Sequence, residues 1–194
     1  MNTIVTPPRR EVPRPVMVDH KLDVVGSEAA DIQLPIPNPT LLPDRIIASM
    51  SPVLIIRHPI FTFTSYMRAA TVFGGTAFDS EFQLMATYRW QRIIYDFYRE
   101  YYDKADSEWK KDWPIVVDGD KLVEDTKGQM QKFCALTCIC WHDQGVTFAK
   151  DSSLDVEEHM KKWTEEWDER VAQQLKKAVE ASMEDYEYLL KYSI

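Results

Sequence analysis

Residues 52–69 of the sequence read PVLIIRHPIFTFTSYMRA and predict a strand, a tight turn and a helix in direct succession. The run Val53–Ile56 is short and aliphatic, which is typical of a strand buried on both faces of a parallel sheet. Pro59 follows at a position that a first helical turn tolerates, and helix-compatible spacing continues to about Ala70. This order places Arg57 at the carboxyl end of a strand that we expect to be central.

Strands and helices are expected to alternate on both sides of this unit. Upstream, PVMV from Pro15 to Val18 predicts a strand that ends at Asp19 and His20. The other expected elements are a short helix at 44–50, a long helix at 79–103, a strand at 115–117, helices at 121–125 and 127–139, and one long or once-broken helix at 154–192. This pattern predicts an α/β fold with a small parallel sheet flanked by helices and a long C-terminal helix.

The C-terminal helix carries an apolar stripe at steps of three and four residues, which predicts a buried face. From residue 151 onward the chain has twelve acidic and six basic residues, and we expect them on a solvated outer face. The stripe consists of Trp163, Trp167, Val171, Leu175, Ala178, Ser182, Tyr186 and Leu189.

Length and composition limit the class of protein. With 194 residues, we expect a flexible segment at 1–14 and a single α/β domain at 15–194, of which 153–192 is a helical C-terminal extension. The net charge of -8 argues against partners such as nucleic acid or an anionic membrane. Neither a membrane span nor a signal peptide is evident, so a cytoplasmic protein is expected.

Arg57 and Ser65 are the first candidates for a binding site, and we expect both to face a crevice at the carboxyl edge of the sheet. Ligands of open α/β sheets bind at such an edge, and an arginine beside a helix N-terminus is suited to an anion. The alternative is an arginine that pairs with a local carboxylate. One carboxylate-rich turn, Asp118-Gly119-Asp120, follows the strand at 115–117 and is suited to capping the next helix.

Three segments resemble the sulfotransferase-like family, including its fungal branch, and they occur along the chain in the same order as in that family. A strand followed by R-x-P, with a serine eight residues after the arginine, is similar to the element that binds the 3′-phosphate of 3′-phosphoadenosine 5′-phosphosulfate (PAPS), which implies this role for Arg57 and Ser65. WPIVVDGDKLVEDTKGQMQKF, residues 113–133, resembles the family's later strand, acidic turn and helix start. PVMVDHKL, residues 15–22, resembles the strand that ends in the catalytic K-x-H motif.

The sequence also departs from the family pattern. Sulfotransferases hold the 5′-phosphosulfate in an N-terminal Gly-rich loop, whereas residues 1–73 contain one glycine, Gly26, and one lysine, Lys21. Val18 replaces the lysine of K-x-H, and an acidic helix after Ser153 takes the place of the R-K-G element. We therefore expect a truncated sulfotransferase-like fold that works without a cofactor, with PAPS as the cofactor in the alternative case.

His20 becomes the expected catalytic base, because the resemblance places it there and a histidine titrates near neutral pH. The alternative is a surface or structural histidine. Asp19 is a possible helper, although neighbouring residues on a strand point to opposite faces. His58 is expected near the same crevice, either at the anion or in a structural role.

Cys134, Cys138 and Cys140 with His142 raise the question of a metal site, because thiolate and imidazole bind zinc. Zinc motifs usually use a C-x2-C knuckle, and this chain has C-x3-C on a helix that is expected to pack against the sheet. Buried free cysteines and no metal are therefore predicted.

The function we expect is acid/base chemistry on a polyketide-like small molecule, either free or bound to a carrier protein. His20 takes a proton from an enol or hydroxyl, the oxygen attacks an ester or thioester, and a lactone or pyrone ring closes while Arg57 stabilises the oxyanion. The alternatives are a PAPS-dependent sulfotransferase that acts on a small hydroxylated metabolite, and a non-catalytic binding protein. In the non-catalytic alternative, the C-terminal helix pairs with its copy through Trp163 and Trp167. A homodimer is also expected for the enzyme.

Overall fold

The computed structural model of the chain describes residues 34–104, 110–139 and 153–194. Within them, β1 (Val53–Ile56) and β2 (Ile115–Asp118) pair in parallel. Val53 lies opposite Ile115 and Ile56 lies opposite Asp118, so the carboxyl ends of the two strands meet at one edge. These residues are mostly helical around this small sheet, an arrangement compatible with the expected α/β class.

The strand β1 is less buried than the sequence predicted. Ile55 is 64% exposed and Val53 is 36% exposed, whereas Ile56 is completely buried. All four residues of β2 are buried, because β2 pairs with β1 on one side and with the chain end on the other, where the Ile194 N–H donates to the Val116 carbonyl. In the described part of the chain, β2 is therefore the inner strand and one face of β1 is open.

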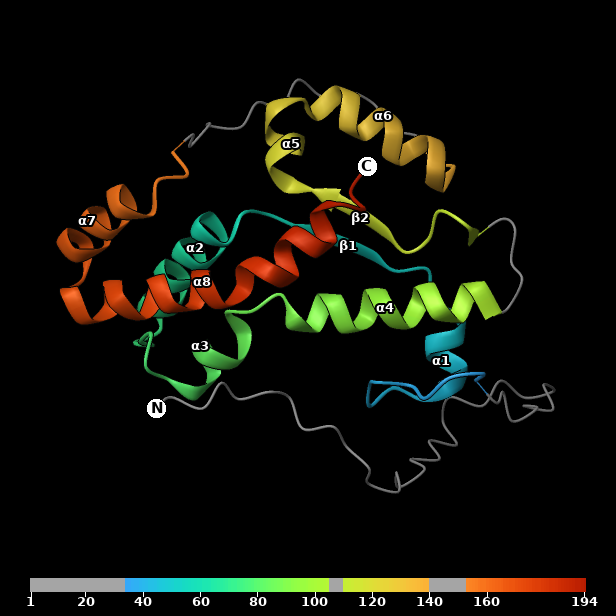
Figure 1. The fold of residues 1–194 in the computed structure, drawn as a ribbon, viewed down its shortest axis with the longest axis horizontal. Helices are drawn as coiled ribbons and strands as arrows, with labels where there is room; N and C mark the ends of the chain where they lie inside the picture. Colours follow the sequence, from blue (N-terminus) through green and yellow to red (C-terminus); the bar gives the residue numbers. More distant parts are fainter. Residues whose placement is uncertain (1–33, 105–109, 140–152) are drawn as a thin grey trace.

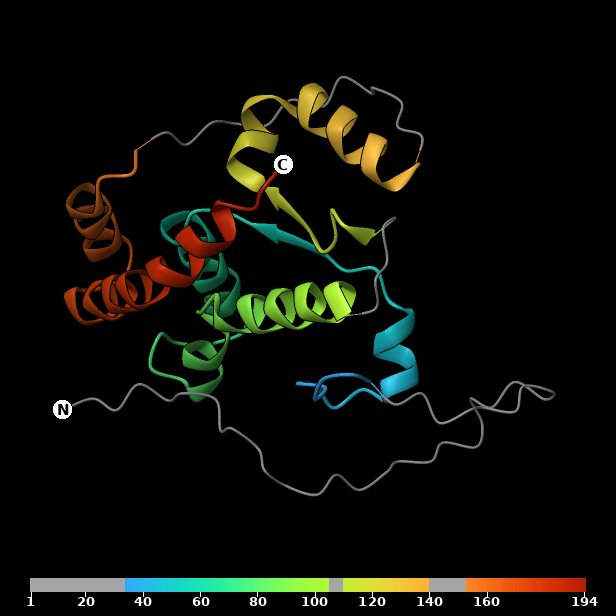
Figure 2. The ribbon, with the colours of Figure 1, turned by 45° about the vertical axis from the view of Figure 1, so that its right-hand side comes forward.

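The helices form two layers around the strands. Figures 1 and 2 show α5 and α6 on one side of the strands, and α4 and α8 on the other. The helices are α1 (Asp44–Ser49), α2 (Pro59–Val72), α3 (Ser80–Met85), α4 (Arg89–Lys104), α5 (Gly119–Glu124), α6 (Thr126–Thr137), α7 (Val156–Glu166) and α8 (Glu169–Leu190).

The single long helix expected at 79–103 is wrong, because the chain breaks between α3 and α4. Tyr88 lies in the break, is 3% exposed and turns its hydroxyl toward the end of β1. The Thr87 hydroxyl accepts the Arg89 N–H at 3.1 Å and so satisfies a backbone donor at the start of α4. The break thus serves to bring Tyr88 to the strand edge, which an uninterrupted helix would not do.

The sequence predicted one long or once-broken helix at 154–192. The structure confirms the once-broken form, with the break between α7 and α8. Asp168 caps α8, because its Oδ1 accepts the Val171 N–H at 2.8 Å. The predicted stripe is confirmed as the buried face: Leu175 and Leu189 are completely buried, and Trp167 and Ala178 pack at its border. The helix α8 contacts α2, α4 and both strands, so it closes the main core.

Trp163 does not serve the dimer contact that the sequence suggested. Its side chain is completely buried in the core of the chain itself, and its indole Nε1 donates to the Thr64 hydroxyl at 2.8 Å. Trp167 is half-buried against the same core. A second copy of the chain cannot reach Trp163 without unpacking α7, so a homodimer stays a prediction without this route.

A smaller core joins α1 to α4. The Tyr98 hydroxyl donates to the Ile47 carbonyl at 2.7 Å, and both side chains are buried. This packing confirms the short helix expected at 44–50 and anchors it beneath the C-terminal half of α4 (Figure 2).

The helix α6 confirms the element expected at 127–139 but not its packing. Its main contact is with α5, and Gln129 is its one buried residue. Asp125 begins α6 by accepting the Gly128 N–H at 2.9 Å, and Cys138 ends it in a left-handed conformation with φ of 57°. The expectation that α6 packs against the sheet is therefore wrong.

Some expectations lie outside the described residues, namely the flexible segment at 1–14 and the strand at 15–18. The division into a domain at 15–194 with an extension at 153–192 stays a prediction. Within the described ranges, no helix combines the length and apolar character that crossing a membrane requires.

Candidate functional site

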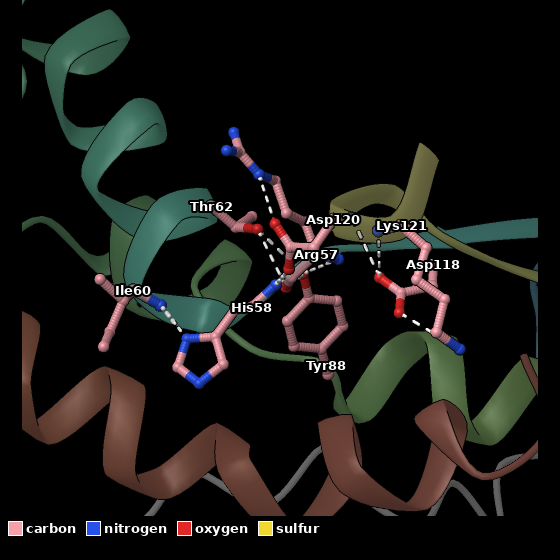
Figure 3. Close-up of polar contacts among 8 residues, drawn as sticks. All are labelled: Arg57, His58, Ile60, Thr62, Tyr88, Asp118, Asp120 and Lys121. Carbon is pink, nitrogen blue, oxygen red and sulfur yellow. Dashed lines mark hydrogen bonds and ion pairs between the residues drawn. The ribbon is translucent and has the colours of Figure 1, made fainter. Parts of the chain in front are cut away.

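The turn between β1 and α2 lies at the carboxyl edge of the sheet and is the centre of a cluster of polar contacts (Figure 3). Its centre is Arg57, whose backbone is bonded on both sides to one side chain. The Tyr88 hydroxyl accepts the Arg57 N–H at 3.1 Å and donates to the Arg57 carbonyl at 2.5 Å. The Thr62 hydroxyl also donates to that carbonyl, at 3.2 Å. Burial raises the pKa of Tyr88, so the phenol keeps the proton that it donates at neutral pH.

Asp120 fixes the same turn from the other strand. Its Oδ1 accepts the Arg57 Nε–H at 3.0 Å, and its Oδ2 accepts the His58 N–H at 2.7 Å. Asp120 lies in the first turn of α5, which begins where β2 ends. Because the two strands are parallel and in register, their ends bring residues 63 positions apart into direct contact.

The Asp118-Gly119-Asp120 turn allows the end of β2 to lie close to the end of β1. The buried Asp118 caps α5 as the sequence predicted, since its Oδ1 accepts the backbone N–H of Asp120 at 2.9 Å. A Cβ at Gly119 would lie 2.9 Å from the Ile56 carbonyl oxygen, which is closer than real Cβ contacts. A glycine at this position therefore lets the end of β2 close against the end of β1.

The guanidinium of Arg57 has one engaged end and one free end. Asp120 takes Nε, which confirms the expected alternative of a local carboxylate partner. The terminal nitrogens, Nη1 and Nη2, have no hydrogen-bond partner among the described residues, and Figure 3 shows them pointing away from the labelled cluster. The side chain is 35% exposed, and its Cζ lies 4.8 Å from the ring centroid of Phe61. The pairing with Asp120 thus leaves the two terminal nitrogens of the guanidinium, with their four N–H donors, without a partner among the described residues.

His58 has a structural role in this arrangement. Its Nδ1 accepts the Ile60 N–H at 3.3 Å and caps α2, and its ring lies edge-on to Tyr186 of α8, with 5.3 Å between centroids. Burial is the main cause that lowers the pKa of His58, which favours the neutral ring that this acceptor role needs. That His58 also binds a ligand stays a prediction.

The N-terminus of α2 supplies little to an anion. Pro59 has no N–H, the Ile60 N–H is capped by His58, and the N–H groups of Phe61 and Thr62 both donate to the His58 carbonyl. The helix amides expected to support the anion are therefore already used within the chain. The cationic donors at this edge come from the Arg57 side chain.

The other residues predicted for this site are Ser65, His20 and Asp19. Ser65 is exposed on α2, and its hydroxyl makes no hydrogen bond to another described residue. His20 and Asp19 lie outside the described residues, so their catalytic roles stay predictions. Two surface hollows lie away from Arg57: one of about 390 Å³ on α8 and one of about 310 Å³ on α7. The larger of the two is lined by Phe78, Glu169, Arg170, Gln173, Gln174 and Lys177.

The cysteines give no sign of a metal site in the described part of the chain. Cys134 is half-buried and Cys138 is exposed, and both are free thiols. Cys140 and His142 lie outside the described residues. No group of three histidine, cysteine or acidic side chains that could hold a metal occurs among residues 34–104, 110–139 and 153–194.

Sequence reasoning missed Asp120 and Tyr88 as members of the site. The sequence predicts Asp120 only as part of a helix-capping turn, and Tyr88 falls within the long helix expected at 79–103. The available signal was the pair of acidic residues directly after a predicted parallel strand, because the ends of parallel strands meet at one edge. No comparable local signal indicates Tyr88.

Comparisons with known proteins find two similar curated proteins. No family model and no solved structure matches the chain. Sulfotransferase ppzF of Metarhizium majus (strain ARSEF 297) is 27% identical over 187 residues, and the protein of the same name from Metarhizium rileyi (strain RCEF 4871) is 25% identical. Both matches cover 78% of this chain and 55% of the relative, so the chain spans about half the length of these curated relatives. The similarity supports a sulfotransferase-like family, in agreement with the motifs around Arg57.

Proposed function

We propose that this chain is an enzyme of the sulfotransferase-like class that binds the 3′-phosphate of PAPS at Arg57 and serves sulfuryl transfer to a small hydroxylated metabolite. The observation that carries the proposal is the free Nη1–Nη2 end of Arg57 at the carboxyl edge of a parallel sheet. A guanidinium with two parallel donors matches two oxygens of a phosphate group. The names of the relatives support the same class of reaction.

The chain's own residues would divide the work as follows. Arg57 binds two phosphate oxygens through Nη1 and Nη2, while Asp120 and Tyr88 hold it in place. His20, which the resemblance places as the base, takes the proton of the acceptor hydroxyl. The cofactor supplies the sulfuryl group. The described residues fit the 3′-phosphate end, and residues 1–194 show no Gly-rich loop for the other end.

A second candidate is the cofactor-independent acid/base reaction expected from the sequence. The single glycine and single lysine of residues 1–73 favour it. His20 would remove a hydroxyl or enol proton, the oxygen would form a bond to an ester or thioester carbonyl, and the leaving alcohol or thiol would take the proton back from His20. Arg57 would stabilise the oxyanion with its free donors, and Asp19 would assist.

Isothermal titration calorimetry with adenosine 3′,5′-bisphosphate separates the two candidates. We expect micromolar binding by the wild type, and loss of this binding in Arg57→Ala. Arg68→Ala is the matched control, because it removes an arginine of the following helix, α2, that pairs with Glu166 instead. Absence of heat at millimolar ligand would overturn the sulfotransferase proposal.

If the nucleotide fails to bind, the second candidate has its own assay. A diketo thioester would be offered to the wild type and to His20→Ala, and pyrone formation would be followed by absorbance. Cyclisation by the wild type and its loss in the variant would support acid/base catalysis. Equal rates in both proteins would overturn it.

A further inference from the structure

Asp120 is the one described side chain that bridges the Arg57 guanidinium to the backbone of the β1–α2 turn. Each of its carboxylate oxygens accepts a separate donor, Oδ1 from Arg57 Nε and Oδ2 from the His58 N–H. Two bonds to different atoms of one turn fix both the position and the rotation of the carboxylate. Asp120 therefore holds the arginine side chain in a fixed relation to its own backbone.

The backbone that carries the Asp120 carboxylate is also fixed by contacts. The backbone N–H of Asp120 donates to the buried Asp118, and the close approach of Gly119 to the Ile56 carbonyl fixes the distance between the two strand ends. The register that pairs Ile56 with Asp118 thus places Asp120 at the level of the Arg57 turn. This support makes Asp120 a rigid element and not a loosely placed surface acid.

The bond to Nε determines which edge of Arg57 can meet an anion. A guanidinium can bind an anion side-on, through Nε and Nη2, or end-on, through Nη1 and Nη2. Asp120 occupies Nε, and the ring of Phe61 lies 4.8 Å from Cζ on one face. The end-on edge stays free among the described residues, and Figure 3 shows it directed outward.

We propose that Asp120 is a positioning residue that fixes Arg57 for end-on binding of a phosphate-type anion through Nη1 and Nη2. This inference rests on the proposed function, since it concerns the same anion site. It assigns a role to a residue that the anion itself does not touch.

The charge of Asp120 and its positioning role predict opposite changes in the affinity for the anion. A carboxylate beside a phosphate site repels the phosphate, so removal of the charge alone would strengthen binding. Loss of positioning weakens binding, because the anion must then order a free arginine side chain. A fall in affinity on removal of Asp120 therefore reports positioning and cannot come from the charge.

The experiment measures the affinity for adenosine 3′,5′-bisphosphate by calorimetry, together with thermal unfolding of each variant. We expect Asp120→Ala to weaken binding by about tenfold or more, as for loss of a charge-assisted hydrogen bond. Asp120→Asn should lose less, because its amide oxygen still accepts from Nε and its shape is kept. Asp125→Ala is the matched control: it removes a helix cap in the same region without touching Arg57, and it should leave the affinity unchanged.

A signal from Arg57 itself gives a second readout. The Nε–H proton of Arg57 should exchange slowly with water in the wild type and in Asp125→Ala, and rapidly in Asp120→Ala, as followed by NMR. Equal or tighter binding by folded Asp120→Ala would overturn the positioning role alone. Absence of binding to the wild type would overturn the proposed function and the end-on anion site together.

Discussion

The packed helices and the Arg57 turn are held together by different forces. In the helical part, α7 and α8 bury a continuous apolar stripe against α2, and Leu175 and Trp163 are completely buried. In the turn, side chains from three separate segments meet through hydrogen bonds around Arg57. Burial stabilises the first region in proportion to area, whereas the second depends on the geometry of a few bonds. The helices therefore supply stability, and the turn supplies a precisely placed cation.

The largest effect should come from breaking the helical core. Leu175→Ala removes a completely buried side chain from α8 and should lower the free energy of unfolding by about 2–5 kcal/mol, because the lost burial is joined by a cavity. Urea denaturation measures the change. Lys177→Ala, at an exposed position of the same helix, should change it by less than about 0.5 kcal/mol. Similar losses in the two variants would show that α8 is not packed as described.

Breaking the polar turn should cost less. Tyr88→Phe removes the hydroxyl that bonds both the N–H and the carbonyl of Arg57, and should lower the free energy of unfolding by about 1–3 kcal/mol. The control is Tyr101→Phe, whose hydroxyl makes no hydrogen bond to another described residue and whose loss should be near zero. A stable Tyr88→Phe protein, equal to its control in urea denaturation, would contradict the role of Tyr88 in the turn.

Acid should weaken the turn through His58. The folded pKa of His58 lies below 6.5, mainly through burial; the charge of His159 lowers it further, whereas Asp120 and Glu187 raise it. The unfolded chain therefore binds more protons, so this contribution to stability is complete above pH 6.5 and is lost as the pH falls toward the folded pKa.

The variant His58→Asn tests this pH dependence, because asparagine also caps helices and does not titrate. Its free energy of unfolding should fall less steeply than that of the wild type below pH 6.5, when both are measured by urea denaturation across the pH range. Parallel curves would show that His58 does not link the turn to pH.

The smallest effect should come from the surface pair that joins α2 to α7. Arg68 donates to both carboxylate oxygens of Glu166 at 2.8 Å, and the Arg68 side chain is 58% exposed. Arg68→Ala should cost about 0.2–1 kcal/mol, and the loss should shrink in high salt, because exposed ion pairs are screened. A loss that is unchanged in 1 M salt would point to packing of the arginine stem instead.

Helical periodicity was the most reliable guide to the fold. The stripe of α8 and the strand-turn-helix around Arg57 follow directly from the spacing of residues, because burial selects one face of a helix. Errors arose where tertiary contacts override local pattern. Tyr88 leaves the helical register to reach Arg57, and the aliphatic Ile55 of β1 stays exposed because no described element covers that face.

The candidate site was predictable only in part. Arg57 was placed correctly at the carboxyl end of a strand, because the local sequence sets that order. Its partnership with Asp120 spans 63 positions and depends on strand register, which no local pattern records. The burial of Trp163 follows the stripe predicted from the sequence, whereas a homodimer stays a prediction.

The sequence by itself determined most of the helices and strands, apart from the break between α3 and α4, as well as the residues that follow each strand and the motifs that resemble a sulfotransferase-like family. These properties are local, because hydrogen bonding and side-chain spacing act over a few residues. The tertiary structure alone decided that Asp120 takes Nε of Arg57 and leaves Nη1 and Nη2 free. That choice required two parallel strands to end at the same level, with a glycine between them small enough to let their ends meet.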